Sequence, residues 1–366
     1  MGKFAFIIHP IELEDIYRKF SFMRYWPDRL VEGVMKRVPP FKVSEITGIE
    51  SPHGKTSGWF ITCPLTSKQM VTLPQEFVMK KIIAAGKAAE ELGVDVIGLG
   101  AMTSVVGDAG ITVANNLSTA VTTGNSYTVA TALEGAKKAA ELMGIERDKA
   151  EILIVGATGS IGSAAARILA REAKYLTLLA RDERKLEYLS RQILAESGLA
   201  VRVTSNIKRA VPSADIIIAV TGSADSVIEV DDLKPGAIVC DVARPRDVSK
   251  KVAEKRDDIL VIEGGVVQVP GEVNFNFDFG FPPGTSYACM AETMILAMEN
   301  RYENFSLGRD IRISQIDTIS ALAQKHDFKL AGFRSFEKAV SREKILAIRE
   351  RAEKELAGAP LFVKNI

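Results

Sequence analysis

Residues 151–170, EILIVGATGSIGSAAARILA, give the strongest indication of the fold. An apolar run predicts a buried strand, three glycines follow at the spacing G-x-x-G-x-x-G, and small residues with helical periodicity come next. This succession is typical of a dinucleotide-binding unit, in which the helix N-terminus faces the phosphate groups of the ligand. The glycine spacing by itself is a weak signal, and a purely structural turn is the alternative.

Each glycine of this loop has its own predicted role. Gly156 permits the tight turn after the strand, and Gly159 lets a pyrophosphate approach the backbone. Gly162 allows the following helix to pack closely on the sheet. The cofactor contacts predicted for the loop are Gly156, Thr158, Gly159, Ser160, Ile161 and Gly162.

Outward from the loop, short apolar strands alternate with helices. Residues 175–181 and 183–197 predict the next strand and helix, and further apolar runs follow. The alternation predicts an α/β fold with a Rossmann-type, doubly wound parallel sheet. Because such sheets bind ligands at the carboxyl ends of their strands, the strand ends at 219–223 and 263–267 supply further cofactor candidates. These candidates are Thr221, Gly222, Gly264 and Gly265.

The end of the second strand distinguishes between the two nicotinamide cofactors. NAD-binding sites usually carry Asp or Glu there, which accepts hydrogen bonds from the ribose hydroxyls. This chain has Arg181, followed by Arg184 and Lys185, and a guanidinium suits the 2′-phosphate of NADP. We therefore expect NADPH as the cofactor. The alternative is that these charges only form a solvated helix start.

The length of 366 residues predicts two domains, or one domain with a large insertion. The alternating segment predicts an NADP-binding Rossmann domain at 149–274, and we expect residues 1–148 and 275–366 to form a second α/β domain that binds substrate. The amphipathic helix at the C-terminus is expected to pack on the body of the protein. The main helices expected outside the Rossmann domain are 10–23, 76–92, 126–144, 285–301, 313–326 and 341–358.

The composition argues against several classes of protein. With 47 basic and 46 acidic residues, the chain lacks the charge excess of a nucleic-acid binder. No apolar stretch reaches the roughly 18 residues of a membrane span. Three widely separated cysteines indicate reduced thiols and a cytoplasmic location, and no cysteine or histidine pair has metal-ligand spacing. We expect His53 and His326 at the surface.

Residues 281–297, FPPGTSYACMAETMILA, place Cys289 between turn residues and an apolar helix. Thr285 or Ser286 is suited to cap that helix, so that Cys289 falls in its first or second turn, where the helix N-terminus favours a thiolate. Glu292 follows on the same face as a possible partner of the cap. The alternative for Cys289 is a small core residue. A thiolate combined with a nicotinamide site is equipment for reducing an acyl thioester to an aldehyde.

Six blocks of the sequence resemble the cyanobacterial long-chain acyl-(acyl-carrier-protein) reductase family, in order, from about residue 4 to about residue 330. The glycine loop is shared with many reductases, whereas the blocks around Cys289, 122–128 and 304–309 are much more specific. The segment from about residue 335 extends beyond the usual end of the family, and residues 20–60 are divergent. The blocks are FIIHPIELED (6–15), TTGNSYT (122–128), VGATGSIGSA (155–164), IEGGVV (262–267), YACMAETMIL (287–296) and NFSLGRDIRIS (304–314).

The resemblance implies an enzyme that reduces a long-chain fatty acyl thioester with NADPH, with Cys289 as the nucleophile that accepts the acyl group. His9 matches a histidine of the family's first block and is implied as an acid or base, with a structural hydrogen bond as its alternative. The implied partners are acyl-carrier protein or acyl-CoA as donor and an enzyme that consumes the aldehyde. The substrate contacts expected from 122–128 and 98–104 are Thr123, Gly124, Asn125, Ser126 and Ser104, although 122–128 is also suited to be an N-capping turn.

Two other functions remain open. An enzyme of the shikimate-dehydrogenase type also joins a small N-terminal domain to a Rossmann domain, but it needs a catalytic Lys and Asp pair on the former. Lys55, Lys68 and Asp95 are the residues present for that role. A non-catalytic NADPH-binding sensor is the second alternative. The acyl chain length, the donor and the oligomeric state do not follow from the sequence.

Overall fold

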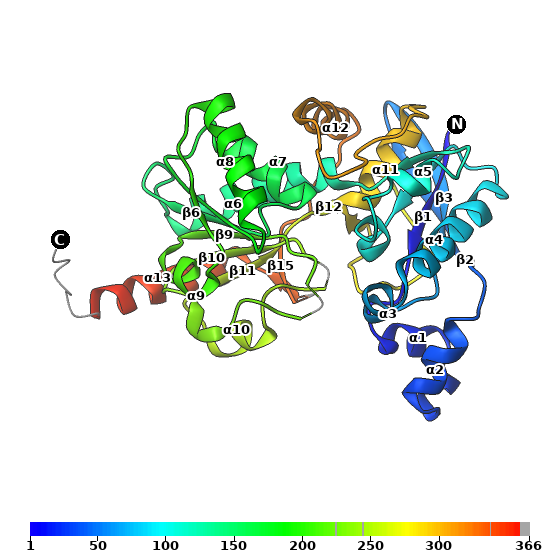
Figure 1. Cartoon of the computed structure of the whole chain (residues 1–366), viewed down its shortest axis with the longest axis horizontal. Helices are drawn as coiled ribbons and strands as arrows, with labels where there is room; N and C mark the ends of the chain where they lie inside the picture. Colours follow the sequence, from blue (N-terminus) through cyan, green and yellow to red (C-terminus); the bar gives the residue numbers. More distant parts are fainter. Residues whose placement is uncertain (224, 244, 337, 359–366) are drawn as a thin grey trace. The chain divides into compact units, whose positions relative to one another are not determined.

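The computed structural model describes residues 1–358 with the exception of 224, 244 and 337 (Figure 1). The chain forms two compact units. Unit 1 comprises Met1–Thr131 and Gly265–Ala331, and unit 2 comprises Ala132–Gly264 and the segment that begins at Gly332. These units differ from the expected domains, whose boundaries were 148, 274 and the end of the chain.

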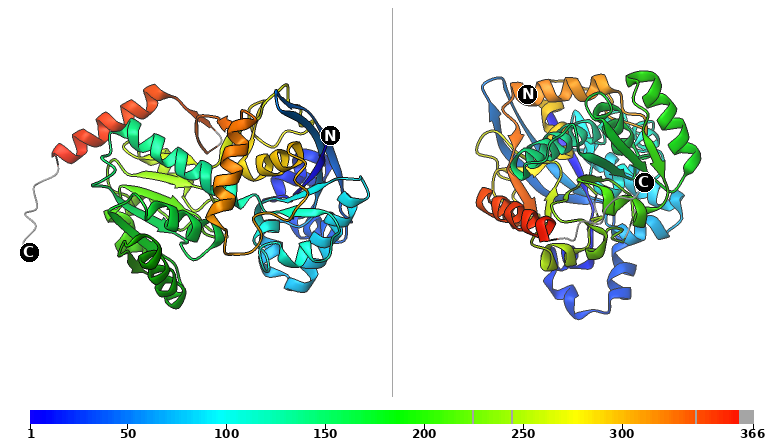
Figure 2. Two further views of the ribbon diagram at one scale, coloured as in Figure 1. Left: turned by 90° about the horizontal axis from the view of Figure 1, so that it is seen from above. Right: turned by 90° about the vertical axis from the view of Figure 1, so that its left-hand side faces the viewer.

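Continuous secondary structure explains the difference at the first boundary. Helix α6 (Asn125–Met143) begins in unit 1 and ends in unit 2, whereas the expected boundary lay at the start of the next strand. The last segment joins unit 2 through the hairpin β15 (Phe333–Ser335) and β16 (Lys338–Val340) and through α13 (Arg342–Gly358). Figure 2 shows α13 alongside unit 2, where Arg349 lies against Gly144 at the end of α6.

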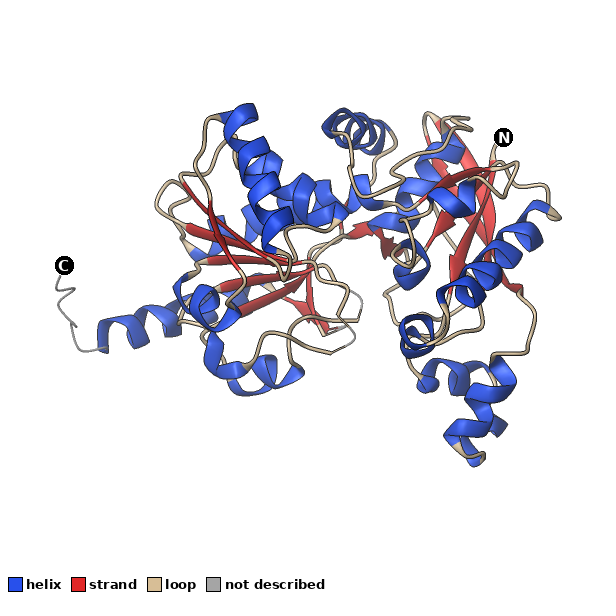
Figure 3. Ribbon diagram, viewed as in Figure 1, coloured by secondary structure: helices blue, strands red, loops and turns tan. Residues whose placement is uncertain are grey.

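Unit 2 is built on a six-stranded sheet of the order β11-β10-β9-β6-β7-β8, in which neighbouring strands are parallel. Helices α7 and α8 cover one face and α9 and α10 the other (Figures 1 and 3), which confirms the predicted Rossmann-type fold. Strands that are buried on both faces read as continuous apolar runs, which made them visible in the sequence. The strands are β6 (Glu151–Val155), β7 (Tyr175–Leu179), β8 (Arg202–Thr204), β9 (Ile216–Ala219), β10 (Ile238–Asp241) and β11 (Leu260–Glu263). The helices are α7 (Ser160–Leu169), α8 (Glu183–Ser197), α9 (Ile207–Ala210), η3 (Val211–Ser213), η4 (Val230–Asp232) and α10 (Lys250–Lys255).

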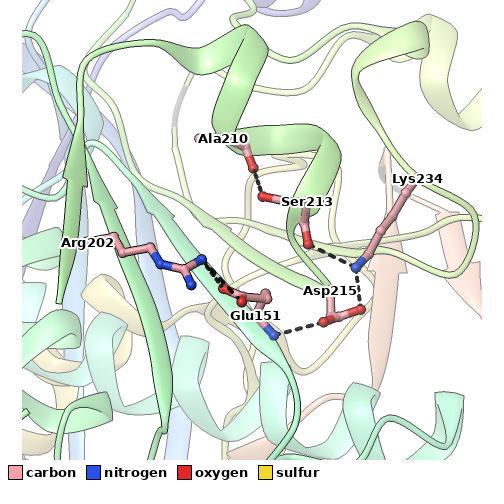
Figure 4. Close-up of polar contacts among 6 residues, drawn as sticks. All are labelled: Glu151, Arg202, Ala210, Ser213, Asp215 and Lys234. Carbon is pink, nitrogen blue, oxygen red and sulfur yellow. Dashed lines mark hydrogen bonds and ion pairs between the residues drawn. The ribbon is translucent and has the colours of Figure 1, made fainter. Parts of the chain in front are cut away.

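Polar contacts fasten the amino edge of this sheet (Figure 4). Asp215 accepts a hydrogen bond from the backbone N–H of Glu151 at 2.8 Å and forms an ion pair with Lys234 at 2.6 Å. The Glu151 carboxylate pairs with Arg202 at 3.3 Å, and Lys234 donates to the carbonyl of Ser213 at 2.9 Å. These contacts join the starts of β6, β8 and β9, so the glycine loop lies at the other, carboxyl edge.

Unit 1 contains a five-stranded sheet of the order β2-β3-β1-β4-β5, in which β2 and β3 are antiparallel and the other neighbours parallel. Phe4 and Phe6 of β1 pack with helix α11 (Ala288–Met298), and Ala5 and Ile7 pack with α4 (Gln75–Glu90). Because successive strand residues face opposite sides, the two helices cover opposite faces of the sheet. The strands are β1 (Lys3–Ile8), β2 (Phe41–Ser51), β3 (Gly54–Thr62), β4 (Val96–Leu99) and β5 (Ala120–Thr122).

Two expected helices of unit 1 differ in the structure. The helix expected at 10–23 extends over 13–19 alone, and the one expected at 285–301 begins at 288, because 285–287 pair with β12 as a strand. Among the described residues, no helix is both long and apolar enough to cross a membrane. The remaining elements of unit 1 are α1 (Leu13–Lys19), η1 (Ser21–Tyr25), α2 (Asp28–Met35), α3 (Ser67–Thr72), η2 (Ala101–Ser104), α5 (Ile111–Ala114), β12 (Val266–Gln268), β13 (Thr285–Tyr287), α12 (Ile313–Lys325) and β14 (Lys329–Leu330).

Candidate active site

The glycine loop of unit 2 connects β6 to α7 as predicted. Gly156 has a φ of +90°, and a Cβ atom there would lie 2.8 Å from the Val220 carbonyl oxygen. A Cβ on Gly162 would lie 2.4 Å from the carbonyl oxygen of Gly156, so the protein's own packing requires both glycines. Gly159, by contrast, has its nearest neighbour at an ordinary 3.4 Å. The space at Gly159, together with the N-terminus of α7, suits the close approach of a pyrophosphate.

The side chains of this loop are partly accessible. Thr158, Ser160 and Ile161 are half-buried, and the latter two belong to the first turn of α7. The first backbone N–H groups of a helix have no partner within it, so this turn can donate hydrogen bonds to phosphate oxygens. The loop therefore fits a dinucleotide in both shape and charge.

The arginine expected to read the 2′-phosphate lies just beyond β7. Arg181 is exposed and, like Arg184, forms no ion pair within the described part of the chain. Asp182 is the N-cap of α8: its carboxylate accepts a hydrogen bond from the backbone N–H of Lys185 at 3.2 Å. The one nearby carboxylate is thus engaged as a helix cap, and the guanidinium of Arg181 remains available for an anion.

The other predicted cofactor residues fall into two groups. Thr221 donates from its backbone N–H to Asp247 at 2.7 Å and from its hydroxyl to the same carboxylate, while Gly222 is exposed. Burial raises the pKa of Asp247 to about 7, although the Thr221 hydrogen bonds oppose that rise. Gly264 and Gly265 are buried; a Cβ atom on Gly264 would lie 2.6 Å from a Val242 methyl group, whereas Gly265 is favoured by its left-handed φ of +78°.

Cys289 is the second residue of helix α11 and is half-buried. The prediction of a first-turn cysteine is confirmed, but the predicted cap is wrong. Tyr287 occupies the N-cap, while Thr285 and Ser286 belong to β13, whose backbone pairs with β12. The N-terminal turn of a helix favours negative charge, so this position supports a thiolate.

Gly124 of the block 122–128 lies directly behind Cys289. A Cβ atom on Gly124 would lie 2.3 Å from both Cα and Cβ of Cys289. Its φ of +73° is in the left-handed region, which side chains other than glycine's rarely adopt. Two blocks separated by more than 150 residues therefore meet backbone to backbone at the thiol.

Glu292, one turn after Cys289, lies fully buried beneath this contact. It accepts hydrogen bonds from the Thr122 hydroxyl at 2.5 Å, the Tyr127 backbone N–H at 2.8 Å and the Ser306 hydroxyl at 2.7 Å. Burial raises the pKa of the Glu292 carboxyl, and these three hydrogen bonds oppose the rise. The expected partnership of Glu292 with the helix cap is wrong, because its carboxylate holds the block 122–128 against α11 instead.

The block 304–314 joins the same site. Asn304 accepts from the Val121 backbone N–H at 2.8 Å, and the Phe305 N–H donates to the Val121 carbonyl at 3.0 Å. Ser306 was not among the predicted residues, although the specificity of its block was the signal that could have identified it. Its hydroxyl contacts Ser126 at 2.6 Å, and its carbonyl accepts from the Thr123 hydroxyl at 2.5 Å.

The residues predicted to contact the substrate have structural roles in unit 1. Thr123 and Ser126 are buried and bond within unit 1, Gly124 faces Cys289, and Asn125 is the buried first residue of α6. Ser104 is also buried and donates to the Ala101 carbonyl at 2.7 Å. The structure therefore favours the interpretation of 122–128 as a structural turn that supports the thiol.

His9 has both ring nitrogens engaged with the backbone. Nδ1 lies 2.9 Å from the Pro10 carbonyl oxygen, and Nε2 accepts from the Met102 N–H at 3.0 Å. Burial lowers the pKa of His9, so the neutral imidazole is favoured. This arrangement joins the ends of β1 and β4 and supports the structural alternative for His9.

His326 was expected at the surface, and that expectation is wrong. The side chain is fully buried, with Nδ1 2.8 Å from the Ser51 hydroxyl and Nε2 2.5 Å from a Glu299 carboxylate oxygen. The end of α12 packs here on the β2–β3 hairpin, a contact between segments about 270 residues apart in sequence.

Comparison with known proteins supports the nucleotide-binding assignment. Residues 136–262 match the shikimate / quinate 5-dehydrogenase family, and this segment lies entirely within unit 2. L-tryptophan dehydrogenase from Nostoc punctiforme is 12% identical, covers 97% of this chain and 89% of its own, and has a TM-score of 0.40. That superposition is too loose to bear on function.

Two curated proteins are similar over most of the chain. Aminotransferase PigE from Serratia sp. is 30% identical over 95% of this chain, which spans 42% of that protein's length. Long-chain acyl-[acyl-carrier-protein] reductase from Synechococcus elongatus is 29% identical over 89% of this chain and 98% of its own length. Together with the family match, the latter similarity, although distant, supports a dehydrogenase or reductase.

The three cysteines should differ sharply in reactivity. Cys63 and Cys240 are fully buried, and burial raises the pKa of the Cys63 thiol to about 12. We expect N-ethylmaleimide at pH 8 to add once to the native protein, at Cys289, and three times after unfolding, as read by intact and peptide mass. A Cys289→Ala variant should gain no rapid adduct. Rapid labelling of Cys63 in the native protein would contradict the burial described here.

The contact between Gly124 and Cys289 can be tested by adding one methyl group. Gly124→Ala should lower the free energy of unfolding by at least about 2 kcal/mol, through the unfavourable φ and the overlap with Cys289. Gly135→Ala, in the helix α6 that follows Gly124, meets open space and is the matched control, expected within about 1 kcal/mol of wild type. Urea denaturation measures both; equal stability of the two variants would exclude the close contact.

Proposed function

We propose that this protein reduces a long-chain fatty acyl thioester to the fatty aldehyde with NADPH, through a thioester on Cys289. The observation that carries the proposal is the placement of Cys289 in unit 1. It is the partly accessible thiol among three, it lies in the first turn of α11, and its backbone rests on Gly124. The similarity to the Synechococcus elongatus reductase extends through this region.

The first step of the proposed reaction is a thioester exchange. The Cys289 thiolate attacks the acyl carbonyl carbon, the bond from that carbon to the donor sulfur breaks, and the donor thiolate leaves and takes up a proton. One thioester replaces another, so the step is nearly balanced in energy. The N-terminal turn of α11 supports the attacking anion.

The residues that pack behind the Cys289 thiol hold it in a fixed position. Glu292 and its three hydrogen-bond donors fix the position of Gly124, and Gly124 fixes Cys289. A nucleophile held in one position loses little orientational freedom in the transition state. We assign Glu292 and Ser306 as positioning residues on this ground.

The cofactor proposed for unit 2 is NADPH. When bound, NADPH supplies the hydride that converts the acyl thioester to an aldehyde and restores the thiol. The residues suited to hold it are those of the loop from Gly156 to Gly162 for the pyrophosphate, with Arg181 and Arg184 for the 2′-phosphate. Exposed Gly222 offers its backbone at the end of β9.

The donor and the cellular setting are parts of the same proposal. Acyl-carrier protein and acyl-CoA both present the acyl group as a thioester, and either satisfies the chemistry at Cys289. We place the reaction in the cytoplasm, because the proposed nucleophile is a reduced thiol. An aldehyde-consuming enzyme is the partner expected downstream.

The alternative of a shikimate-dehydrogenase type of enzyme has less support in unit 1. The family match covers unit 2 and so does not bear on the substrate. Asp95 accepts from the Lys3 backbone N–H at the amino edge of the sheet, while Lys68 lies in α3, beyond the carboxyl end of β3. Asp95 and Lys68 are therefore at opposite edges of the sheet, and Lys55, the second residue of β3, shares the amino edge with Asp95, away from the carboxyl ends at which such sheets bind ligands.

Removing the thiol tests the proposed nucleophile. Cys289→Ala should reduce aldehyde formation from acyl-CoA at least about a thousandfold, because no covalent intermediate can form, while NADPH binds as in wild type. Incubation of wild type with acyl-CoA alone should add one acyl group to the intact mass, and Cys240→Ala should retain that adduct. Normal turnover by Cys289→Ala would refute the mechanism, and NADPH binding without turnover in wild type would indicate a sensor.

Removing the guanidinium tests the cofactor assignment. Arg181→Ala should weaken NADPH binding by about 10- to 100-fold, the value of one lost charge-assisted hydrogen bond, and leave NADH binding nearly unchanged. Arg191→Ala on α8, whose side chain pairs with Glu187 at 3.8 Å, is the matched control. Fluorescence titration with both nucleotides gives the comparison; equal losses for the two would remove the phosphate assignment.

A further inference from the structure

A basic hollow on unit 1 has no role in the chemistry described so far. It has a volume of about 510 Å³ and is lined by Gly33, Lys36, Arg37, Phe77 and Lys81. The first three come from the C-terminal end of α2 and the two residues beyond it, and the last two come from the first two turns of α4. The lining thus includes three cations and one aromatic ring.

The charges of this hollow are not neutralised by neighbouring carboxylates. The Nζ atoms of Lys36 and Lys81 lie 5.3 and 5.9 Å from the centre of the Phe77 ring. Arg37 and Lys81 donate to backbone carbonyl groups at 3.1 and 2.9 Å. Within the described part of the chain, none of the three cations forms an ion pair. Like charges gathered in this way repel one another, so an anion in the hollow is favoured.

A neighbouring lysine on α4 shows the contrast. Lys80 forms an ion pair with Glu76 at 2.7 Å and is largely exposed. An acidic side chain is therefore present on the same helix, but it neutralises a lysine that does not line the hollow. The positive charge of the hollow is a local property of its lining rather than of the helix.

The hollow and Cys289 lie at the same edge of the unit 1 sheet. α2 belongs to the segment between the end of β1 and the start of β2, and Phe41 at that start pairs with Thr62 at the carboxyl end of β3. α4 follows β3 and runs back towards the start of β4. Cys289 contacts Gly124, which comes directly after β5. A donor approaching the carboxyl edge thus meets both features on one unit.

We propose that this hollow binds the phosphate of the phosphopantetheine arm that carries the acyl group. The inference rests on the proposed function, because that arm is the common part of acyl-CoA and acyl-carrier protein. Lys36, Arg37 and Lys81 donate charge-assisted hydrogen bonds to the phosphate oxygens, and Phe77 packs against the arm. The hollow therefore recognises the phosphate of the donor, and this recognition does not depend on the acyl chain.

The test compares two ligands that differ in the phosphate alone. Calorimetric titration of the full chain should give weaker binding of pantetheine than of phosphopantetheine by about tenfold or more. Lys36→Gln and Lys81→Gln should each reduce that difference several-fold and leave pantetheine binding unchanged, whereas Lys80→Gln should alter neither. Lys36→Gln spares the hydrogen bond that Lys81 makes to the backbone, so a folding defect in one variant does not decide the result.

Each outcome bears on the hollow separately from the reaction. The proposal is overturned if the lysine variants lose the same affinity for pantetheine as for phosphopantetheine, or lose affinity for neither. This holds even if wild type reduces acyl-pantetheine. A phosphate-dependent difference that the variants abolish supports the hollow even if no thioester is reduced, in which case the proposed function alone fails. Titration with CoA and with holo-acyl-carrier protein then distinguishes the two sources, the tighter binder being the donor.

Discussion

The contact between the backbones of Gly124 and Cys289 is the constraint on which unit 1 depends. It requires a glycine with a left-handed φ at one side and the first turn of a helix at the other. A contact this close leaves no room for adjustment, so the elements on both sides must be fixed by other means. The buried side chain of Glu292 fixes them, because it accepts hydrogen bonds from the segments on both sides. These donors also make the burial of the carboxyl group tolerable.

The hydrogen bonds of Glu292 also make the site cooperative. Its donors come from the end of β5, the first turn of α6 and the segment after α11. Loss of any one donor would leave a buried carboxylate less well satisfied, which is unfavourable by about 1–3 kcal/mol. The three segments therefore hold one another in position. The Cys289 thiol is held rigid indirectly, because Glu292 fixes Gly124 and Gly124 contacts the backbone of Cys289.

Local pattern was sufficient to predict the Rossmann fold and the glycine loop. Apolar runs such as 152–155 and 216–219 mark strands buried on both faces, and the spacing of Gly156 and Gly162 reflects steric demands within a single turn. The first-turn position of Cys289 followed in the same way from the turn residues before it.

What the sequence could not show were contacts between distant segments. The bonds of Glu292 to Thr122 and Ser306, and the burial of His326 against Ser51, depend on which strands and helices become neighbours.

The chain passes from one unit to the other at 131, 264 and 331, and the last of these crossings has a practical consequence. A gene fragment for residues 132–264 would encode the parallel sheet without its terminal hairpin and helix. It would lose the ion pair between Glu263 and Arg334 and would expose the part of the unit 2 core against which Phe336 packs. An independently expressed nucleotide-binding module thus requires a fusion of residue 264 to residue 332, or a circular permutation that keeps both segments on one polypeptide.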